Sequence, residues 1–318
     1  MQPDPVTRQF LQTLASGPPG PRLHEMAPAD ARAMAAGLPE AFPETYPAPP
    51  ADVETRTISG GPNGELTTHI VRPAGSRGRL PVVMFFHGGG WLLGDFSSHR
   101  RLVHEIAVGV NAAVVFPEYS LSPEVRFPVA NEEAYFATKY VAENAGALNI
   151  DASRIAVAGD SAGANMACVV CMLSKERGGP KISGAALFFP VAGADFDTAS
   201  YNEFADGYFL TRDSMKWFWD HYAPDLNARK HPHASLLLAS DDELQALPPT
   251  FLMTCEFDVL RDEGEALAHR LIAAGVPVTG ARYLGTIHTC VTQAALANTP
   301  ATRVIIGAAN AHLRQTLA

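Results

Sequence analysis

The chain has 318 residues, of which 47% are hydrophobic and only 18% are charged. This length suffices for one large α/β domain or two smaller ones, and the low charged fraction fits a large buried sheet. The net charge of −9 argues against binding to nucleic acid or to anionic membrane surfaces. The first residues lack a basic stretch followed by an apolar one, and no apolar run has the length of a membrane span. We therefore expect a cytoplasmic protein.

The first 50 residues are predicted to form a helical layer that is separate from the sheet. They are rich in alanine and proline, and segments 6–15 and 29–36 have the composition of helices. A β-hairpin is expected next, because the strand-like segments 53–58 and 66–71 flank a Gly-rich turn. We expect residues 1–50 to belong to a cap and the sheet to begin near residue 51.

From residue 81 the pattern changes to an alternation of strands and helices. The continuous apolar strands between helices are typical of a parallel sheet that is covered on both faces. The hairpin would add antiparallel strands at one edge of this sheet. The fold is thus predicted to be an α/β-hydrolase-like arrangement, with strands at 82–86, 112–116, 154–158, 183–189, 250–255 and 277–283 and helices at 98–109, 128–145, 162–176, 262–274 and 301–316.

Residues 191–248 interrupt this alternation. The stretch 207–222 within them is aromatic and largely helix-like. An insertion at this point would lie over the carboxyl ends of the strands, where ligands bind in open α/β sheets. We expect it to complete the cap together with residues 1–50, which leaves residues 51–190 and 249–318 as the two parts of the core.

A G-x-S-x-G motif, Gly159–Gly163, is the most informative feature of the chain. It follows an apolar strand and precedes a helix-like segment, which is the context of a nucleophile elbow. Such a turn exposes the central serine, Ser161, close to the unpaired N–H groups of a helix N-terminus. A chance serine in a Gly-rich turn is the alternative interpretation.

A second motif, His87–Trp91 with the sequence HGGGW, argues against a chance origin of the first motif. It also follows an apolar strand. Three consecutive glycines leave the backbone bare, so that amide N–H groups can approach a ligand closely. This pattern is typical of the oxyanion loop of lipases and esterases.

A serine nucleophile needs a histidine base and a carboxylate that orients the base. His288 is the favoured histidine because it follows the last predicted strand on a loop after a glycine. The other histidines lie mid-helix, before the nucleophile or in the insertion. The carboxylate should follow the strand 250–255, where four residues compete: Glu256, Asp258, Asp262 and Glu263. Asp258 is the first choice, since the last two would open a helix and act as helix-capping charges there.

No metal site or cofactor is expected. Cys168 and Cys171 form a C-x-x-C inside a predicted helix, and further ligands at zinc spacing are absent from the sequence. His231 and His233 are interpreted as surface residues. All four cysteines are expected to be free, and Cys290, two residues after His288, is expected to be a packing residue.

These motifs together resemble the hormone-sensitive-lipase-like family of α/β-hydrolase esterases, in its GDSAG type. The resemblance runs from about residue 52 to 290 and is carried by the segments 119–128, 151–165, 258–263 and 285–288. It implies a catalytic triad of Ser161, Asp258 and His288. It also implies an oxyanion hole formed by backbone N–H groups of Gly89, Gly90 and Ala162.

The resemblance implies a serine carboxylesterase that hydrolyses short- to medium-chain acyl esters and requires no cofactor. It also favours a homodimer. Two rival functions stay open: an amidase or carbamate hydrolase with the same triad, and a non-catalytic protein that binds a small molecule. Position and resemblance further suggest apolar pocket walls from Trp91, Phe96, Tyr208, Phe209 and Leu210, although plain core packing would account for most of these rings.

Overall fold

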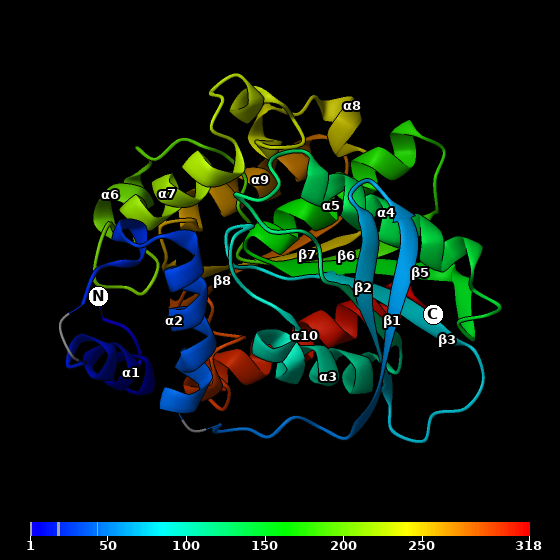
Figure 1. Cartoon of the computed structure of the whole chain (residues 1–318), viewed down its shortest axis with the longest axis horizontal. Coiled ribbons are helices and arrows are strands. Elements are labelled where there is room, and N and C mark those ends of the chain that lie inside the picture. The colour runs from blue at the N-terminus through cyan, green and yellow to red at the C-terminus, as the bar shows by residue number, and fades with distance from the viewer. Residues whose placement is uncertain (1, 18–19, 43) are drawn as a thin grey trace.

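A computed structural model describes residues 2–17, 20–42 and 44–318. In this part of the chain, eight strands form one sheet in the order β1-β2-β4-β3-β5-β6-β7-β8 (Figure 1). The first two strands run antiparallel to their neighbours and the other pairs are parallel. The strands are β1 (Ala51–Gly61), β2 (Gly64–Pro73), β3 (Leu80–Phe86), β4 (Ala113–Pro117), β5 (Ile150–Asp160), β6 (Ile182–Phe188), β7 (Thr250–Phe257) and β8 (Val278–Ile287). The predicted fold class, including the antiparallel hairpin at one edge, is confirmed.

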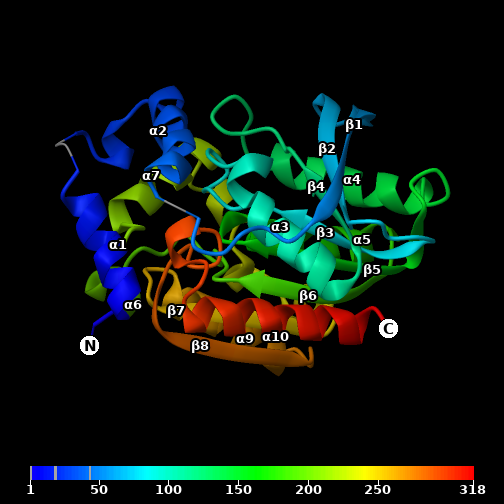
Figure 2. The same ribbon diagram turned by 90° about the horizontal axis from the view of Figure 1, so that it is seen from below.

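Helices cover both faces of the sheet. Helices α4, α5 and α9 lie on one face, and α3 and α10 pack side by side on the other (Figures 1 and 2). Each predicted helix of the alternating region is present, within three residues at either end. Their bounds are α3 (Phe96–Val110), α4 (Val129–Glu143), α5 (Ala162–Glu176), α9 (Arg261–Ala273) and α10 (Pro300–Thr316). No helix in the described ranges is both long and apolar enough to cross a membrane.

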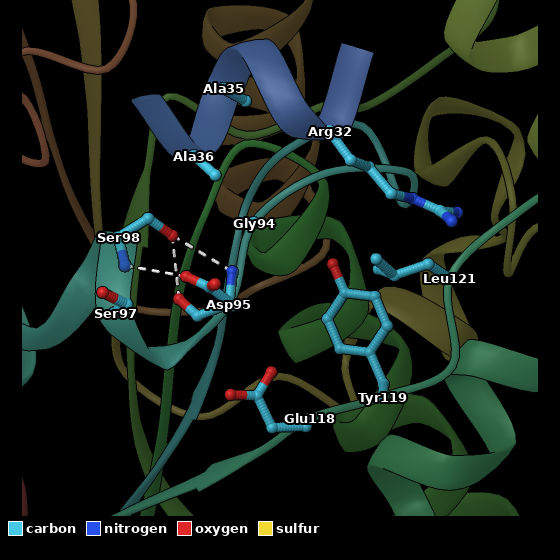
Figure 3. Close-up of a pocket in the computed structure, with 10 residues that line it drawn as sticks. All are labelled: Arg32, Ala35, Ala36, Gly94, Asp95, Ser97, Ser98, Glu118, Tyr119 and Leu121. Carbon is cyan, nitrogen blue, oxygen red and sulfur yellow. Dashed lines mark hydrogen bonds between the residues drawn. The ribbon is translucent and has the colours of Figure 1, made fainter. Parts of the chain in front are cut away.

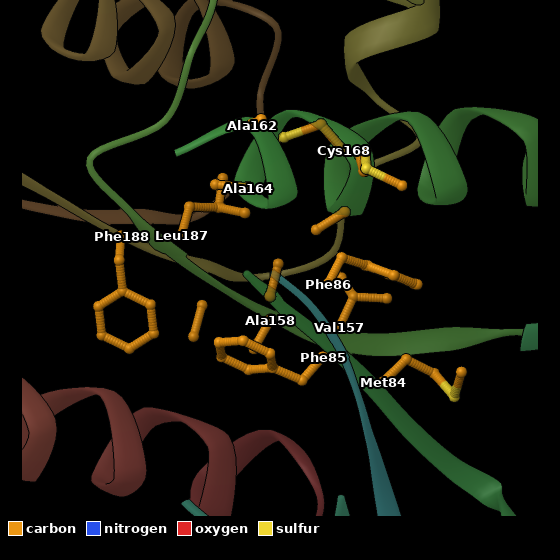
Figure 4. Close-up of a cluster of buried hydrophobic side chains, with 14 of the residues drawn as sticks. Met84, Phe85, Phe86, Val157, Ala158, Ala162, Ala164, Cys168, Leu187 and Phe188 are labelled. Atoms are coloured by element: carbon orange, nitrogen blue, oxygen red, sulfur yellow. The ribbon is translucent and has the colours of Figure 1, made fainter. Parts of the chain in front are cut away.

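The core lies between the sheet and these helices. Successive side chains of a strand point to opposite faces, so a strand that is covered on both sides must be apolar throughout. Figure 4 shows this for β6, where Leu187 points toward α5 and Phe188 points toward the opposite helix layer. Both side chains are completely buried. The continuous apolar runs of the sequence therefore encode the buried centre of the sheet.

Four short or medium helices gather beyond the carboxyl ends of the strands (Figures 1 and 2). We call them the helical layer: α1 (Pro5–Ala15), α2 (Pro28–Ala41), α6 (Ala199–Glu203) and α7 (Arg212–Tyr222). The end of the 191–248 insertion does not belong to this layer, because its short helix α8 (Asp241–Leu244) packs against α9. The domain boundaries expected from the sequence stay predictions, and residues 1, 18, 19 and 43 of the first segment lie outside the described residues.

Polar contacts attach the helical layer to the core. The guanidinium of Arg32, on α2, donates to the carbonyl oxygens of Leu92 (2.9 Å) and Ser122 (2.7 Å). It also pairs with the carboxylate of Glu124 at 2.6 and 2.7 Å. At the start of α1, the backbone N–H of Asp4 donates to Gly285 (3.1 Å), three residues before His288. The layer is thus fixed to the loops that carry the candidate site.

Candidate active site

Ser161 occupies the sharp turn between β5 and α5. Its backbone angles, φ 54° and ψ −119°, lie in a region that non-glycine residues rarely adopt. A Cβ atom on Gly159 would come within 2.4 Å of the carbonyl oxygen of Gly163, and one on Gly163 within 1.9 Å of that of Phe86. Both glycines of the motif are therefore required for the turn to pack against β3.

The structure brings Ser161, His288 and Asp258 together in one hydrogen-bonded chain. The Oγ atom of Ser161 lies 3.0 Å from Nε2 of His288, and Nδ1 of His288 lies 2.7 Å from Oδ2 of Asp258. All three side chains are buried, with exposed fractions of 5%, 3% and 1%. This arrangement can move a proton from the hydroxyl to the imidazole while the carboxylate stabilises the resulting imidazolium.

The competing carboxylates have other partners. Glu256 accepts a hydrogen bond from the backbone N–H of Gly285 (2.7 Å), and Asp262 accepts one from that of Ser200 (2.7 Å). Neither interacts with His288. Besides contacting His288, Asp258 accepts the N–H of Leu260 through its other oxygen at 3.0 Å. The carboxylate position that sequence reasoning left open is thus occupied by its first choice.

The glycine loop, residues 87–93, lies beside Ser161. Gly89 and Gly90 adopt φ angles of 108° and 61°, and a Cβ on Gly89 would come within 2.2 Å of the carbonyl oxygen of Leu93. On Gly90 it would come within 2.3 Å of the Phe218 ring. Because Ala162 is the first residue of α5, its N–H has no acceptor within the helix. Gly89 and Gly90 line the same cavity as Ser161, and Ala162 directly follows Ser161.

This cavity has a volume of about 630 Å³, and Ser161 and His288 are among its lining residues. The helical layer and the loop before α7 supply its apolar walls, which include Leu14, Leu23, Phe42, Phe209, Leu210, Met215 and Phe218. Phe209 and Leu210 are thus among the residues that line this cavity. The cavity volume is within the range of ordinary small-molecule sites.

Three other rings expected in the walls lie elsewhere. Trp91 is completely buried and stacks on Tyr222, with 3.9 Å between the ring centroids. Tyr208 stacks on Phe257 at 5.4 Å, and Phe96 stacks on His69 at 4.3 Å. The expectation that these three rings line the pocket is corrected, because their faces pack against other aromatic rings.

A side pocket of about 380 Å³ adjoins the main cavity (Figure 3). Asp95, Glu118 and Arg32 are among its lining residues, as Figure 3 shows. The two cavities share four lining residues: Ala35, Gly94, Ser97 and Ser98. The side pocket thus adjoins the main cavity next to Ala35 of α2.

Sequence reasoning missed a second buried histidine–aspartate pair. Nε2 of His99 lies 3.2 Å from Oδ1 of Asp160, the residue directly before Ser161. From the sequence, His99 is excluded as the base because it precedes the nucleophile in the chain. The position of His99 shortly after the glycine loop is the one sequence signal for this pair. A contact between segments this far apart in the sequence produces no local pattern.

Glu263 lies in the first turn of α9, as expected, but its side chain bonds to the loop after β6. Its side chain is buried and accepts the backbone N–H of Ala192 at 2.7 Å and that of Gly193 at 3.4 Å. Burial raises the pKa of Glu263 most and the nearby Asp258 also raises it, and against the effect of these two donors the pKa is about 8. Glu263 therefore binds a proton near neutral pH and ties the loop after β6 to α9.

Replacing Glu263 with glutamine is expected to change how stability depends on pH. In the unfolded chain this carboxyl titrates near pH ~4.3, so between about pH 4 and 8 the folded state holds a proton that the unfolded state has released. The free energy of unfolding then falls as the pH rises through this window, by at most about 1.4 kcal/mol per unit. Urea unfolding of both proteins from pH 5 to 9 should show a shallower fall for Glu263→Gln. Equal slopes would mean that the carboxyl is ionised in the folded protein.

The four cysteines are free and buried, as expected. The Sγ atoms of Cys255 and Cys290 lie 3.7 Å apart, so the end of β7 packs against the loop that carries His288. Within the described residues, no group of three or more His, Cys, Asp and Glu side chains has an arrangement suited to a metal ion. His231 is exposed and His233 is half-buried, with ring centroids 4.8 Å apart.

Comparison with known proteins gives the same picture. Residues 83–292 match a protein family described as having the alpha/beta hydrolase fold. The carboxylesterase NlhH of Mycobacterium tuberculosis is 37% identical over 276 residues, which cover 86% of this chain and 84% of that protein.

Solved structures agree closely. A thermostable esterase from Pseudomonas putida superposes with a TM-score of 0.96 at 44% identity, covering 100% of this chain and 98% of that one. An esterase structure from the fungus Rhizomucor miehei gives 0.92 at 40% identity, covering 99% and 97%. The chain belongs to the hormone-sensitive-lipase-like family of α/β-hydrolase fold proteins, as its motifs predicted.

Proposed function

We propose that the protein is a serine carboxylesterase in which Ser161 forms the acyl-enzyme, His288 is the base and acid, and Asp258 orients His288. The observation that carries the proposal is the continuous hydrogen-bonded chain of these three side chains, two of which line a cavity of about 630 Å³. The esterase relatives, one of them 44% identical, support ester hydrolysis over amide hydrolysis and over simple binding.

In the proposed reaction, Nε2 of His288 takes the proton of the Ser161 hydroxyl while Oγ attacks the ester carbonyl carbon. The carbonyl oxygen becomes an oxyanion that accepts hydrogen bonds from the N–H groups of Gly89, Gly90 and Ala162. One such donor is worth about 10²–10³ in turnover. His288 then gives its proton to the leaving alcohol oxygen as the C–O bond breaks. Water repeats the sequence, regenerates the Ser161 hydroxyl and releases the acid.

The cavity walls support a substrate of moderate size with an apolar part. Phe209 and Leu210 contribute apolar surface on one side, and Leu14 and Leu23 contribute it from the N-terminal segment. A cavity of this volume suits short- and medium-chain acyl groups better than long ones. The helical layer then acts as a cap that keeps bulk water from the acyl-enzyme.

The proposal is tested with p-nitrophenyl esters from acetate to palmitate, with matched p-nitroanilides of the same acids, and with diethyl p-nitrophenyl phosphate. We expect kcat/KM for the esters to peak at short or medium chains and to be at least 100-fold lower for the anilides. Diethyl p-nitrophenyl phosphate should abolish activity as one phosphoryl group attaches to Ser161. A higher kcat/KM for anilides would make the protein an amidase. No turnover of any ester, with no label on Ser161, would leave only small-molecule binding.

Shortening one wall residue is expected to move the chain-length preference. Leu210→Ala removes apolar bulk from the cavity, so the ratio of kcat/KM for the octanoate to that for the acetate should rise several-fold. The change also costs roughly 2–5 kcal/mol of stability, as other buried leucine truncations do. Leu247→Ala is the matched control, since Leu247 is buried outside the cavity. A ratio that moves equally in both variants would contradict the placement of the acyl group beside Leu210.

The cytoplasmic location and the homodimer expected from the sequence stay predictions. Cell fractionation tests the first. Size-exclusion chromatography with light scattering tests the second, with a mass near twice the 33.9 kDa of the chain as the expected result.

A further inference from the structure

We propose that His99 is a positioning residue for the oxyanion hole: paired as a cation with Asp160, it neutralises the carboxylate that ties the glycine loop to Ser161. The inference rests on the proposed function, since it concerns the same reaction. It assigns a role to a buried ion pair that the Ser161–His288–Asp258 chain does not use.

Asp160 joins the two halves of the site. Its Oδ1 atom accepts the backbone N–H of Gly88 at 2.9 Å, while its own backbone continues directly into Ser161. The fit is tight, because a Cβ atom on Gly88 would come within 2.3 Å of Oδ2 of Asp160. One carboxylate therefore sets the position of the glycine loop relative to the nucleophile.

That carboxylate is completely enclosed. Asp160 has an exposed fraction of 2%, and a buried ion that lacks a countercharge is costly. It also lies next to the place where the oxyanion would form, so an unpaired negative charge there would oppose the developing negative charge of the transition state. A countercharge at Asp160 is thus needed for the fold and for the reaction.

His99 supplies this countercharge from the first turn of α3. Its Nε2 lies 3.2 Å from Oδ1 of Asp160, and its Nδ1 lies 3.1 Å from the carbonyl oxygen of Asp95. Nδ1 also lies 3.0 Å from the hydroxyl oxygen of Ser98, which itself donates to the Asp95 carbonyl oxygen at 2.8 Å and so can accept from Nδ1. Both ring nitrogens thus face oxygen acceptors, and an imidazole donates from both nitrogens only when it is protonated. The titratable groups around the ring are Asp160 on β5, Asp95 before α3, and His87 after β3, whose ring centroid is 5.5 Å away.

The pKa directions of the neighbouring groups agree with this assignment. Burial by itself lowers the pKa of His99, but the Asp160 carboxylate, together with the carbonyl oxygen and the carboxylate of Asp95, outweighs burial and raises it above the ordinary value. Likewise, burial disfavours ionised Asp160, but His99 brings its pKa below the ordinary value. Burial and the charge of His99 lower the pKa of His87 to about 3, so His87 is neutral. Of the two adjacent histidines, one carries the charge.

The kinetic test is a double-mutant cycle with His99→Gln and Asp160→Asn. His99→Gln leaves the carboxylate without its countercharge, and we expect kcat on p-nitrophenyl esters to fall about 10- to 100-fold with KM changed less than about twofold. This loss is smaller than the roughly 10²–10³ for a whole oxyanion donor. Affinity for an aryl trifluoromethyl ketone, which adds to serine as a tetrahedral oxyanion, should fall in parallel.

The double variant separates charge from packing. With Asp160→Asn in the same chain, no charge needs to be balanced and the amide oxygen can still accept the Gly88 N–H, so kcat should recover at least fivefold over His99→Gln alone. Losses that simply add would assign His99 a packing role and overturn the proposal. His104→Gln is the matched control, because His104 is a buried histidine of the same helix that bonds to Pro49 instead. Its kcat should match that of the wild type.

A measurement of charge keeps this inference distinct from the proposed function. Histidine ¹⁵N NMR spectra, with His99 assigned by its loss in His99→Gln, should show His99 protonated at pH 7 in the wild type and neutral in Asp160→Asn. A neutral His99 in the wild type overturns the inference even if the esterase works as proposed. A charged His99 in a protein without esterase activity would refute the proposed function and retain the ion pair.

Discussion

Replacing Ser161 with alanine is expected to lower kcat for the best p-nitrophenyl ester by a factor on the order of 10⁵–10⁶. The change removes the oxygen that attacks the carbonyl carbon in the proposed reaction, and His288 then has no hydroxyl to deprotonate. In serine hydrolases, loss of the nucleophile costs about as much as loss of the whole triad, since the three groups act as a unit. Substrate binding should survive, because the cavity walls are unchanged.

The measurement combines steady-state rates with labelling by diethyl p-nitrophenyl phosphate, which should fail in Ser161→Ala. Ser174→Ala provides the control: Ser174 is also a buried serine of α5, but it lies more than three helical turns from Ser161, and its hydroxyl has no hydrogen-bond partner in the described structure. Its loss should be nearly neutral for both stability and rate. A Ser161→Ala protein that keeps more than a hundredth of the wild-type rate would place the nucleophile elsewhere.

Features that depend on local chemistry could be predicted from the sequence. The turn at Ser161 needs glycines on both sides because β3 and α5 approach within van der Waals distance there. The five consecutive residues of the G-x-S-x-G motif therefore suffice to predict it. The parallel sheet could be predicted because a strand covered on both faces is apolar at every position. Asp258 and His288 followed from chain order and from the ends of β7 and β8.

Features that depend on contacts between distant segments could not be predicted. Trp91 and Tyr208 belong to aromatic stretches, but which face of a ring meets the cavity depends on partners such as Tyr222 and Phe257 in other elements. Glu263 has the sequence position of a helix-capping charge, yet it is buried because the loop after β6 folds over it. Burial raises the pKa of a carboxyl group and favours its neutral form, and sequence position alone does not report burial.

Asp258→Asn is expected to lower kcat by about 10⁴-fold, as the equivalent change does in other serine triads. An asparagine fits the same space, but its amide group can donate to Nδ1 of His288. Such a bond favours the tautomer with the proton on Nε2, which then cannot accept the Ser161 proton. The loss should appear in kcat with little change in KM, since Asp258 is buried behind His288 and does not line the cavity.

Glu256→Gln is the control that decides which carboxylate serves His288. Glu256 lies two residues from Asp258 and is also buried, but it bonds to the N–H of Gly285 at 2.7 Å, and glutamine can keep this bond through its amide oxygen. We therefore expect at most about a tenfold loss of kcat. If Glu256→Gln instead lost 10⁴-fold while Asp258→Asn stayed active, Glu256 would be the orienting group. Both amide substitutions nearly preserve side-chain volume, so packing would not explain a difference of three orders of magnitude in kcat between the two variants. The loss of the negative charge beside Nδ1 of His288 would explain it.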